Sequence, residues 1–238
     1  MSRQRVGVVG DLDFRNAVEA AGGAPIVERD AIPDASFVVA VGDAAVVDLA
    51  RSGVATPVLP IEAGNGLRSV PRSEGVAAIE RVVGGAYSTE THPVLSIETP
   101  ERTIRALLDA LFVAAEPARI SEYGVHWCGE RVAEFRADGV VVSTPAGSVG
   151  YNDAADGPLV APETDAVSIV PVAPFATDPN RWVVPIESLT VTVERDETPV
   201  ELVVDGRRET ELSAGVPVRF GCADAIETIV VPESRAFF

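Results

Sequence analysis

Lysine is absent from this sequence, so its 19 basic side chains are all arginines, set against 36 aspartates and glutamates. The formal net charge is −17 at pH 7. Binding to a phosphate backbone needs clustered lysine and arginine, so this balance excludes a general nucleic-acid binder. The acids are dispersed and form no tail, which favours adaptation to high internal salt, where a Debye length of ~3 Å at 1 M screens their repulsion. An acidic surface for a basic partner is the alternative.

Cysteine and histidine are scarce, with two of each: Cys128, Cys222, His92 and His126. No two of them have the spacing of zinc ligands, so the sequence predicts no structural metal. The two cysteines favour buried free thiols over a disulfide, because the protein is expected in the cytoplasm. So few histidines also argue against a Ser-His-Asp mechanism.

Long apolar runs are missing as well. No stretch reaches the ~18–20 apolar residues that a membrane-spanning helix needs, and the N-terminus lacks the anatomy of a signal peptide. We therefore expect a cytoplasmic protein. With 238 residues and 47% hydrophobic content, the chain is long enough for one large globular domain or two smaller ones.

The first part of the chain alternates short apolar runs with amphipathic segments. Such alternation predicts a small Rossmann-like α/β domain over residues 1–88, with a parallel sheet and right-handed crossovers. The expected strands are 6–10, 25–29, 36–43 and 56–61, and the expected helices are 11–21, 44–51 and 74–85.

The remainder is rich in strand patterns punctuated by glycine, proline and Asp-Gly. We expect a strand at 91–99, a helix over 101–115 because of its Leu/Ile/Phe stripe, and mostly strands beyond 117. The pair Asp205-Gly206 predicts a hairpin turn. These patterns predict a larger β-sandwich domain over residues 89–238, whose C-terminal end is a candidate to return to the first domain.

The third expected strand ends in Val41-Gly42-Asp43-Ala44 and leads into a helix. Gly42 permits a close backbone approach, and the helix N-terminus offers free N–H groups to a phosphate. Asp43 then stands beside that phosphate as a carboxylate able to accept a proton from a hydroxyl. An aspartate that only begins a helix is the alternative interpretation.

A second stretch, residues 143–158, reads STPAGSVGYNDAADGP after the apolar run GVVV. It matches neither the G-x-S-x-G elbow of a serine hydrolase nor a phosphate loop ending in GK[ST], because the chain has no lysine. Its glycines and hydroxyls suit a cradle for a ligand, and an ordinary loop between strands is the alternative.

The stretch from Asp138 to Tyr151, DGVVVSTPAGSVGY, followed by Gly157-Pro158, resembles the signature of the NAD kinase family. The order of weaker motifs agrees along residues 5–238. VGDA stands where the family has GGDG, and Ser121-Glu122 stands at the place of an Asn-Glu pair. VPVAPF (170–175), RWVVP (181–185) and VVDGR (203–207) are similar to later family strands.

This resemblance implies a phosphotransferase that moves a phosphoryl group from ATP with Mg²⁺, or from polyphosphate, to the 2′-hydroxyl of the adenosine ribose of NAD. It implies an α/β domain plus a β-sandwich, assembled as homodimers or homotetramers. By position, Asp43 matches the catalytic base, Asp138 an aspartate that reaches the ligand across a subunit interface, and Glu122 an acid that engages the ribose or adenosine. The other matching ligand positions are Gly42, Ala44, Asn65, Ser121, Thr144, Ser148, Val149, Gly150 and Tyr151.

Several positions depart from the family pattern. GGDGT is replaced by Val41-Gly42-Asp43-Ala44-Ala45, and the asparagine of the Asn-Glu pair is Ser121. A weakened or inactive relative that binds NAD(P) or another nucleotide, as a sensor or a subunit, is therefore the alternative to a working kinase. A kinase for lipid hydroxyls would share only the GGDG-type element, and the STPAGS stretch argues against it.

Overall fold

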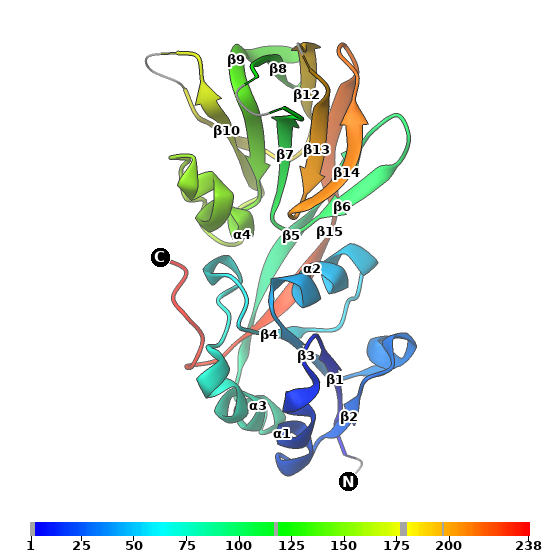
Figure 1. Ribbon diagram of the computed structural model, residues 1–238. Helices are drawn as coiled ribbons and strands as arrows, with labels where there is room; N and C mark the ends of the chain where they lie inside the picture. The colour runs from blue at the N-terminus through cyan, green and yellow to red at the C-terminus, as the bar shows by residue number, and fades with distance from the viewer. Residues whose placement is uncertain (1–2, 117–118, 177–179, 197) are drawn as a thin grey trace. The chain divides into compact units, whose positions relative to one another are not determined.

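The computed structural model describes residues 3–116, 119–176, 180–196 and 198–238. The chain divides into two compact units, here called the first unit (Met1–His92 with Ala225–Phe238) and the second unit (Pro93–Asp224). Figure 1 shows the helices concentrated in the first unit and the long strands in the second. Within the described ranges, no helix is both long and apolar enough to cross a membrane.

The first unit is built on a parallel sheet in the order β2-β1-β3-β4, and the end of β15 lies beside β4. Every residue of β3 and β4 is buried, which is why their sequences are continuous apolar runs rather than alternating ones. The strands are β1 (Arg5–Val9), β2 (Ala24–Ile26), β3 (Phe37–Val41), β4 (Val58–Ile61) and β15 (Pro217–Val230).

Three α-helices of the first unit confirm the helices predicted over residues 11–21, 44–51 and 74–85. They are α1 (Arg15–Ala20), α2 (Asp43–Ser52) and α3 (Gly75–Val83), joined by the short turns η1 (Leu12–Phe14), η2 (Arg29–Asp34), η3 (Asn65–Leu67) and η4 (Arg72–Glu74). Phe14, Val18 and Ile79 pack with Val6 and Val8 in one buried core, so α1 and α3 cover the same face of the sheet.

The second unit is antiparallel, with the strand order β14-β13-β7-β9-β8-β12-β15. Strand β10 pairs with β9 and β11, and β5 pairs with β6. These strands are β5 (Ser88–Glu98), β6 (Thr103–Ala106), β7 (Asp109–Ala114), β8 (Ser121–Trp127), β9 (Glu130–Ser143), β10 (Ala166–Pro174), β11 (Trp182–Pro185), β12 (Leu189–Arg195), β13 (Val200–Val204) and β14 (Arg207–Leu212).

The helix predicted over residues 101–115 is wrong, because this segment forms strands β6 and β7. In β7 the buried residues alternate as Ala110, Phe112 and Ala114, the period of a strand. Both edges of β7 are paired, with β13 on one side and β9 on the other. The apolar spacing of this segment is therefore compatible with a helix and with a strand. Pairing with the neighbouring strands selects the strand.

Both cysteines are exposed, so the expectation of buried thiols is wrong. Cys128 has a φ of +53° and Gly129 one of +79°, so the two form the tight turn between β8 and β9. The thiol at such a hairpin tip faces solvent. The hairpin predicted at Asp205-Gly206 is confirmed, since both residues have positive φ between β13 and β14.

Asp205 also holds the start of β7. Its carboxylate accepts hydrogen bonds from the backbone N–H groups of Leu107 (3.1 Å), Leu108 (2.7 Å) and Asp109 (3.3 Å). The peptide of Asp205 donates in return to the Asp109 carbonyl at 3.0 Å. One turn of the β13–β14 hairpin thus fixes the bend that leads from β6 into β7.

We therefore expect Asp205→Ala to lower the free energy of unfolding by about 2–3 kcal/mol, because three partly buried N–H donors lose their acceptor. Urea unfolding at fixed salt measures this loss. Asp205→Asn, which keeps one acceptor and tolerates positive φ, is the control and should lose less than half as much. An equal loss in the two variants would contradict the capping role.

Candidate functional site

The VGDA turn has one backbone position that requires glycine. Gly42 has φ +86° and ψ 156°, a conformation that residues with a Cβ rarely adopt. Its N–H donates to the Ile61 carbonyl at 2.8 Å, which ties the end of β3 to the end of β4. Val41 and Ala44 are not among the residues with positive φ, so their side chains fit this turn without strain. The valine and alanine that flank Gly42 and Asp43 are therefore compatible with this turn.

Asp43 is the first residue of α2, and its exposed side chain is held in place. Its Oδ1 accepts a hydrogen bond from the N–H of Gly64 at 2.7 Å. Asn65, exposed, follows Gly64 and begins η3. The predicted residues Gly42, Asp43, Ala44 and Asn65 thus gather at the carboxyl ends of β3 and β4, the edge where open α/β sheets bind ligands.

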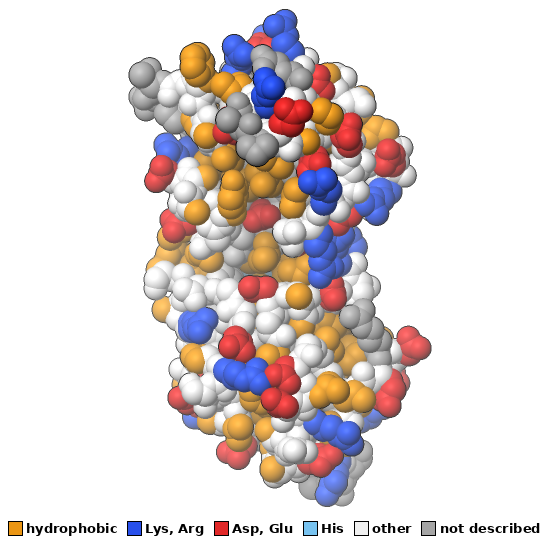
Figure 2. Space-filling model, viewed as in Figure 1, with side chains coloured by type: hydrophobic (Ala, Val, Ile, Leu, Met, Phe, Trp, Pro, Cys, Tyr) orange, Lys and Arg blue, Asp and Glu red, His pale blue; other side chains and the backbone are white. Residues whose placement is uncertain are grey.

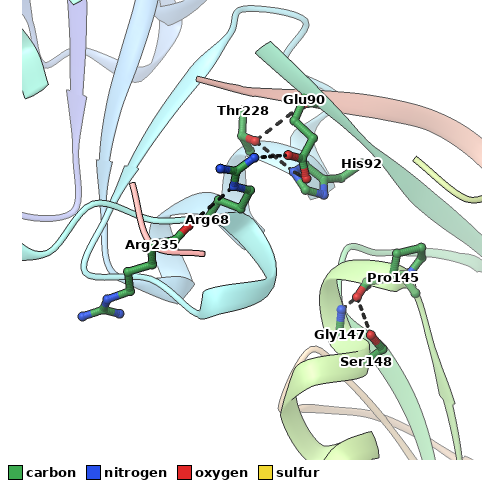
Figure 3. Close-up of polar contacts among 9 residues, drawn as sticks. Arg68, Glu90, His92, Pro145, Gly147, Ser148, Thr228 and Arg235 are labelled. Carbon is green, nitrogen blue, oxygen red and sulfur yellow. Dashed lines mark hydrogen bonds and ion pairs between the residues drawn. The ribbon is translucent and has the colours of Figure 1, made fainter. Parts of the chain in front are cut away.

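The loop of residues 62–69 that supplies Gly64 is anchored by a polar cluster shown in Figure 3. Arg68 has φ +48°, and its guanidinium pairs with Glu90 at 3.3 Å. His92 Nε2 lies 2.9 Å from the Thr228 hydroxyl. Burial lowers the pKa of His92 to about 4, so this imidazole is neutral at pH 7 and acts as a hydrogen-bonding group.

A second polar cluster in the first unit is the ion network around Arg72, the residue that begins η4. Its guanidinium contacts Glu62 at 3.2 Å, Asp13 at 3.1 Å and, at short range, Asp11. It also lies over the Phe14 ring, 5.5 Å from the centroid. The turn after β1 and the loop after β4 are thereby tied together, although such exposed pairs contribute modestly to stability.

In the second unit, the STPAGS stretch is helical. Residues 145–147 form α4 (Pro145–Gly147), and a wider helical turn, η5 (Ser148–Asn152), follows. The hydroxyl of Thr144 donates to the Leu107 carbonyl at 2.6 Å and accepts from Gly147 N–H at 3.1 Å. The hydroxyl of Ser148 donates to the Pro145 carbonyl at 2.7 Å (Figure 3) and accepts from Val160 N–H at 3.0 Å.

Thr144 and Ser148 are both completely buried, so their hydroxyls are used inside the fold. They shape the turn, and the surface available to a ligand is formed by the residues that follow. Val149 is half-buried and Gly150 is exposed, with a non-helical backbone (φ −103°, ψ −121°). A role for all four in lining a dinucleotide stays a prediction.

Tyr151 is 44% exposed and opens into a cavity of about 310 Å³ within the second unit. Two other residues of its lining, Arg181 and Asp156, form an ion pair at 3.8 Å. The cavity has an aromatic side chain, an arginine and a wall from β10, a mixture typical of small-molecule sites. Its lining consists of Tyr151, Ala154, Ala155, Asp156, Pro171, Val172, Ala173, Pro174 and Arg181.

Ser121, Glu122 and Asp138 lie together on the paired strands β8 and β9. Ser121 is buried opposite Ala137, the neighbour of Asp138, and Glu122 is half-buried opposite Arg136. Burial raises the pKa of the Tyr123 hydroxyl to about 12, and the charge of Asp138 adds to this rise. This group lies several residues along β9 from the start of the STPAGS turn, so the second unit holds two separate groups of predicted residues.

The structure adds one residue that the sequence interpretation missed. Asp109 begins β7 and pairs in register with Ser143, the residue before Thr144. Burial, followed by the negative charge of Asp205, raises the pKa of Asp109 to about 6. An acid with such a raised pKa beside the STPAGS turn is a candidate ligand-binding group. The only sequence signal was a single aspartate inside the apolar run LLDALF. The helix predicted over residues 101–115 gave no reason to place this aspartate beside residues 143–148.

The raised pKa of Asp109 makes a prediction about pH. The native state binds the proton more tightly than the unfolded chain, whose carboxyl has a pKa near 3.8. Stability is therefore lost as pH rises from about 4 to about 6, by roughly 3 kcal/mol in total. Asp109→Asn should remove this loss and unfold at higher urea than the parent at pH 7. Equal pH dependence of both proteins between pH 4 and 6 would contradict the assignment.

Comparison with known proteins agrees with this architecture. A family model of the ATP-NAD kinase C-terminal domain matches residues 109–230, just over half of the chain. An NAD kinase of Geobacter metallireducens is 31% identical over 226 residues, covering 89% of this chain and 79% of that protein. An NAD kinase of Methanosarcina mazei is 32% identical over 187 residues, covering 76% of this chain and 65% of that protein. The chain thus spans slightly less than two thirds of the length of this archaeal relative.

Two solved structures share the fold. The yeast NADH kinase complexed with NADH superposes with a TM-score of 0.77 at 17% identity, covering 98% of this chain and 85% of that one. The NAD kinase of Archaeoglobus fulgidus in complex with ATP gives a TM-score of 0.76 at 21% identity, covering 95% and 93%. The mixed α/β sheet and the antiparallel sheet are therefore those of an NAD kinase-like fold. Together with the family match and the sequence relatives, this shows that the chain belongs to the NAD kinase family.

Proposed function

We propose that this protein is an NAD kinase, which transfers a phosphoryl group from ATP or polyphosphate to the 2′-hydroxyl of the adenosine ribose of NAD. The observation that carries the proposal is Asp43, an exposed carboxylate fixed by Gly64 at the carboxyl edge of a parallel sheet. A carboxylate held in one orientation is suited to accept the hydroxyl proton as the ribose oxygen attacks phosphorus.

The start of α2 supplies the electrostatics. Gly42 and Ala44 flank Asp43 at the start of α2, where the positive end of the helix dipole and the N–H groups of the first turn attract a phosphoryl group. In the transfer the ribose oxygen bonds to the γ-phosphorus, the bridging oxygen leaves with ADP, and Asp43 retains the proton. Mg²⁺ enters with ATP as the counter-ion that neutralises the phosphate charge.

We propose that the dinucleotide contacts the remaining predicted positions. Support comes from the cavity beside Tyr151 and from the acids Glu122, Asp138 and Asp109 on neighbouring strands. An exposed aromatic ring offers a stacking surface, and carboxylates accept hydrogen bonds from ribose hydroxyls. The proposed ligand positions are Gly42, Ala44, Asn65, Glu122, Asp138, Val149, Gly150 and Tyr151, with Asp109 added by the structure. The buried residues Ser121, Thr144 and Ser148 belong to the proposed site as the residues that shape its walls.

The second candidate function is a weakened or inactive NAD kinase relative that binds NAD(P) or another nucleotide as a sensor or a subunit. The substitutions around Asp43 favour it. The backbone favours the active enzyme, since the one residue of the turn that needs glycine, Gly42, is a glycine. Formation of NADP decides between the two functions.

Purified protein incubated with NAD, ATP and Mg²⁺ in molar salt should form NADP. Asp43→Asn should lower kcat at least a hundredfold while nucleotide binding, measured by calorimetry, changes less than threefold, because the amide keeps the shape but cannot serve as a base. Asp34→Asn, an exposed aspartate of the same unit, is the control and should keep full activity.

Undiminished turnover in Asp43→Asn would contradict the assignment of the base. Nucleotide binding without NADP formation by the parent protein would favour the non-catalytic relative. Absence of binding at millimolar nucleotide would exclude both functions.

We also propose that the protein is a homodimer or homotetramer in which Asp138 reaches the ligand of the partner copy. Large apolar side chains exposed on the second unit support this, led by Phe175 at 75% exposure, with Val183, Leu159 and Tyr151. Sedimentation should show an oligomer, and Phe175→Asp should shift it toward monomer. A parent protein that sediments as a monomer at all concentrations would contradict this proposal.

Three further features belong to the proposal. The charge balance supports a halophilic, haloarchaeal-type and divergent member, and Figure 2 shows arginine and acidic side chains intermixed over the visible face. Consumption of ATP and NAD fits a cytoplasmic enzyme. The strand order supports a working division into a Rossmann-like domain (1–88) and a β-sandwich (89–238) whose C-terminal end returns to the first.

A further inference from the structure

We propose that Arg235 and Ser69 are positioning residues, which aim the Asp43 carboxylate through the peptide group that joins Ala63 to Gly64. The inference rests on the proposed role of Asp43 and names what holds that side chain in its catalytic orientation. All five residues belong to the first unit.

The carbonyl and the N–H of this one peptide group are both engaged. The Ala63 carbonyl oxygen accepts from the buried Ser69 hydroxyl at 2.5 Å and from the Arg235 guanidinium (Nη1) at 3.3 Å. The Gly64 N–H of the same peptide donates to Asp43 Oδ1 at 2.7 Å. A continuous chain of hydrogen bonds thus runs from a cation, through one peptide, to the carboxylate.

Peptide planarity makes this arrangement directional. The C=O and N–H of a trans peptide point in opposite directions within one plane, so donors that fix the oxygen also fix where the N–H points. Hydrogen bonds in a chain polarise one another, and a cationic donor on the oxygen strengthens the N–H as a donor. Arg235 therefore acts on Asp43 without touching it.

The segment after β15 is secured on both sides of Arg235. The backbone N–H of Arg235 donates to the Ser69 carbonyl at 3.1 Å. The backbone carbonyl of Arg235 accepts from Arg68 Nε at 3.5 Å. Figure 3 shows the guanidinium of Arg235 directed away from this contact with Arg68. Two residues earlier, Glu233 pairs with Arg81 of α3 at 2.7 Å. The anchored backbone therefore holds the Arg235 guanidinium beside the Ala63 carbonyl.

The loop that carries the peptide needs such support. Glu62 and Arg68 both have positive φ, a conformation that is costly for residues with a side chain. Engagement of Oδ1 by Gly64 also orients the carboxylate, which leaves Oδ2 as the oxygen to receive the ribose proton. Loss of the hydrogen bonds from Arg235 and Ser69 to the Ala63 carbonyl should thus reduce turnover more than substrate binding.

The test compares Arg235→Met, which removes charge and donors at similar length, with Arg235→Lys, which keeps both. Ser69→Ala removes the other donor to the Ala63 carbonyl without altering the segment after β15. Arg15→Gln, which breaks an exposed pair with Glu19 on α1, is the charge-matched control. Circular dichroism and urea unfolding establish that each variant is folded.

Two readouts are taken on the full chain. Hydrogen exchange of the Gly64 amide should accelerate roughly tenfold in Arg235→Met and in Ser69→Ala, and should stay at the parent rate in the control. In NADP formation, kcat should fall roughly ten- to a hundredfold with KM for NAD and ATP within twofold, as expected for a misaimed catalytic group. Arg235→Lys should recover at least half of the lost kcat.

Unchanged exchange at Gly64 in Arg235→Met and Ser69→Ala would overturn the proposal, whatever the kinetics. Faster exchange with unchanged kcat would overturn the positioning role. If the parent protein forms no NADP, the proposed function fails, and the exchange experiment still decides whether Arg235 and Ser69 hold the peptide. The two failures are therefore distinguishable.

Discussion

The hydrogen bond from Gly64 N–H to Asp43 Oδ1 is the contact on which the candidate site depends. It joins Asp43, the residue that begins α2, to the loop after β4. The segments that follow β3 and β4 are thereby held together at one edge of the sheet. Gly42 makes this possible, since its φ of +86° turns the chain from β3 into the helix. Valine and alanine at the flanking positions are compatible with this turn, since neither residue has a positive φ.

The second unit follows a different principle, in which buried hydroxyls build a turn whose surface is then available to a ligand. The hydroxyls of Thr144 and Ser148 form hydrogen bonds with the backbone of Leu107, Pro145 and Val160. Their burial makes them structural in effect even where the family pattern associates them with a ligand. The groups available to a ligand are instead the exposed Tyr151 and the half-buried acids nearby, and burial raises the pKa of one of them, Asp109.

The sequence predicted the first unit well because its signals are local. Continuous apolar runs ending in glycine gave β1 and β3, and amphipathic spacing gave α1, α2 and α3. It failed at residues 101–115, where the pairing of β7 with β9 and β13 overrides the helical spacing. It missed Asp109 for the same reason, and no sequence signal shows that Arg235, far along the chain, contacts the Ala63 carbonyl.

The most direct test of the central claim is a phosphorus NMR spectrum of the product formed from NAD and ATP by the purified protein in molar salt. The account predicts one new phosphomonoester resonance, that of a 2′-phosphate on the adenosine ribose, growing as ADP appears. Release of inorganic phosphate without that resonance, or a phosphate on another hydroxyl, would contradict it.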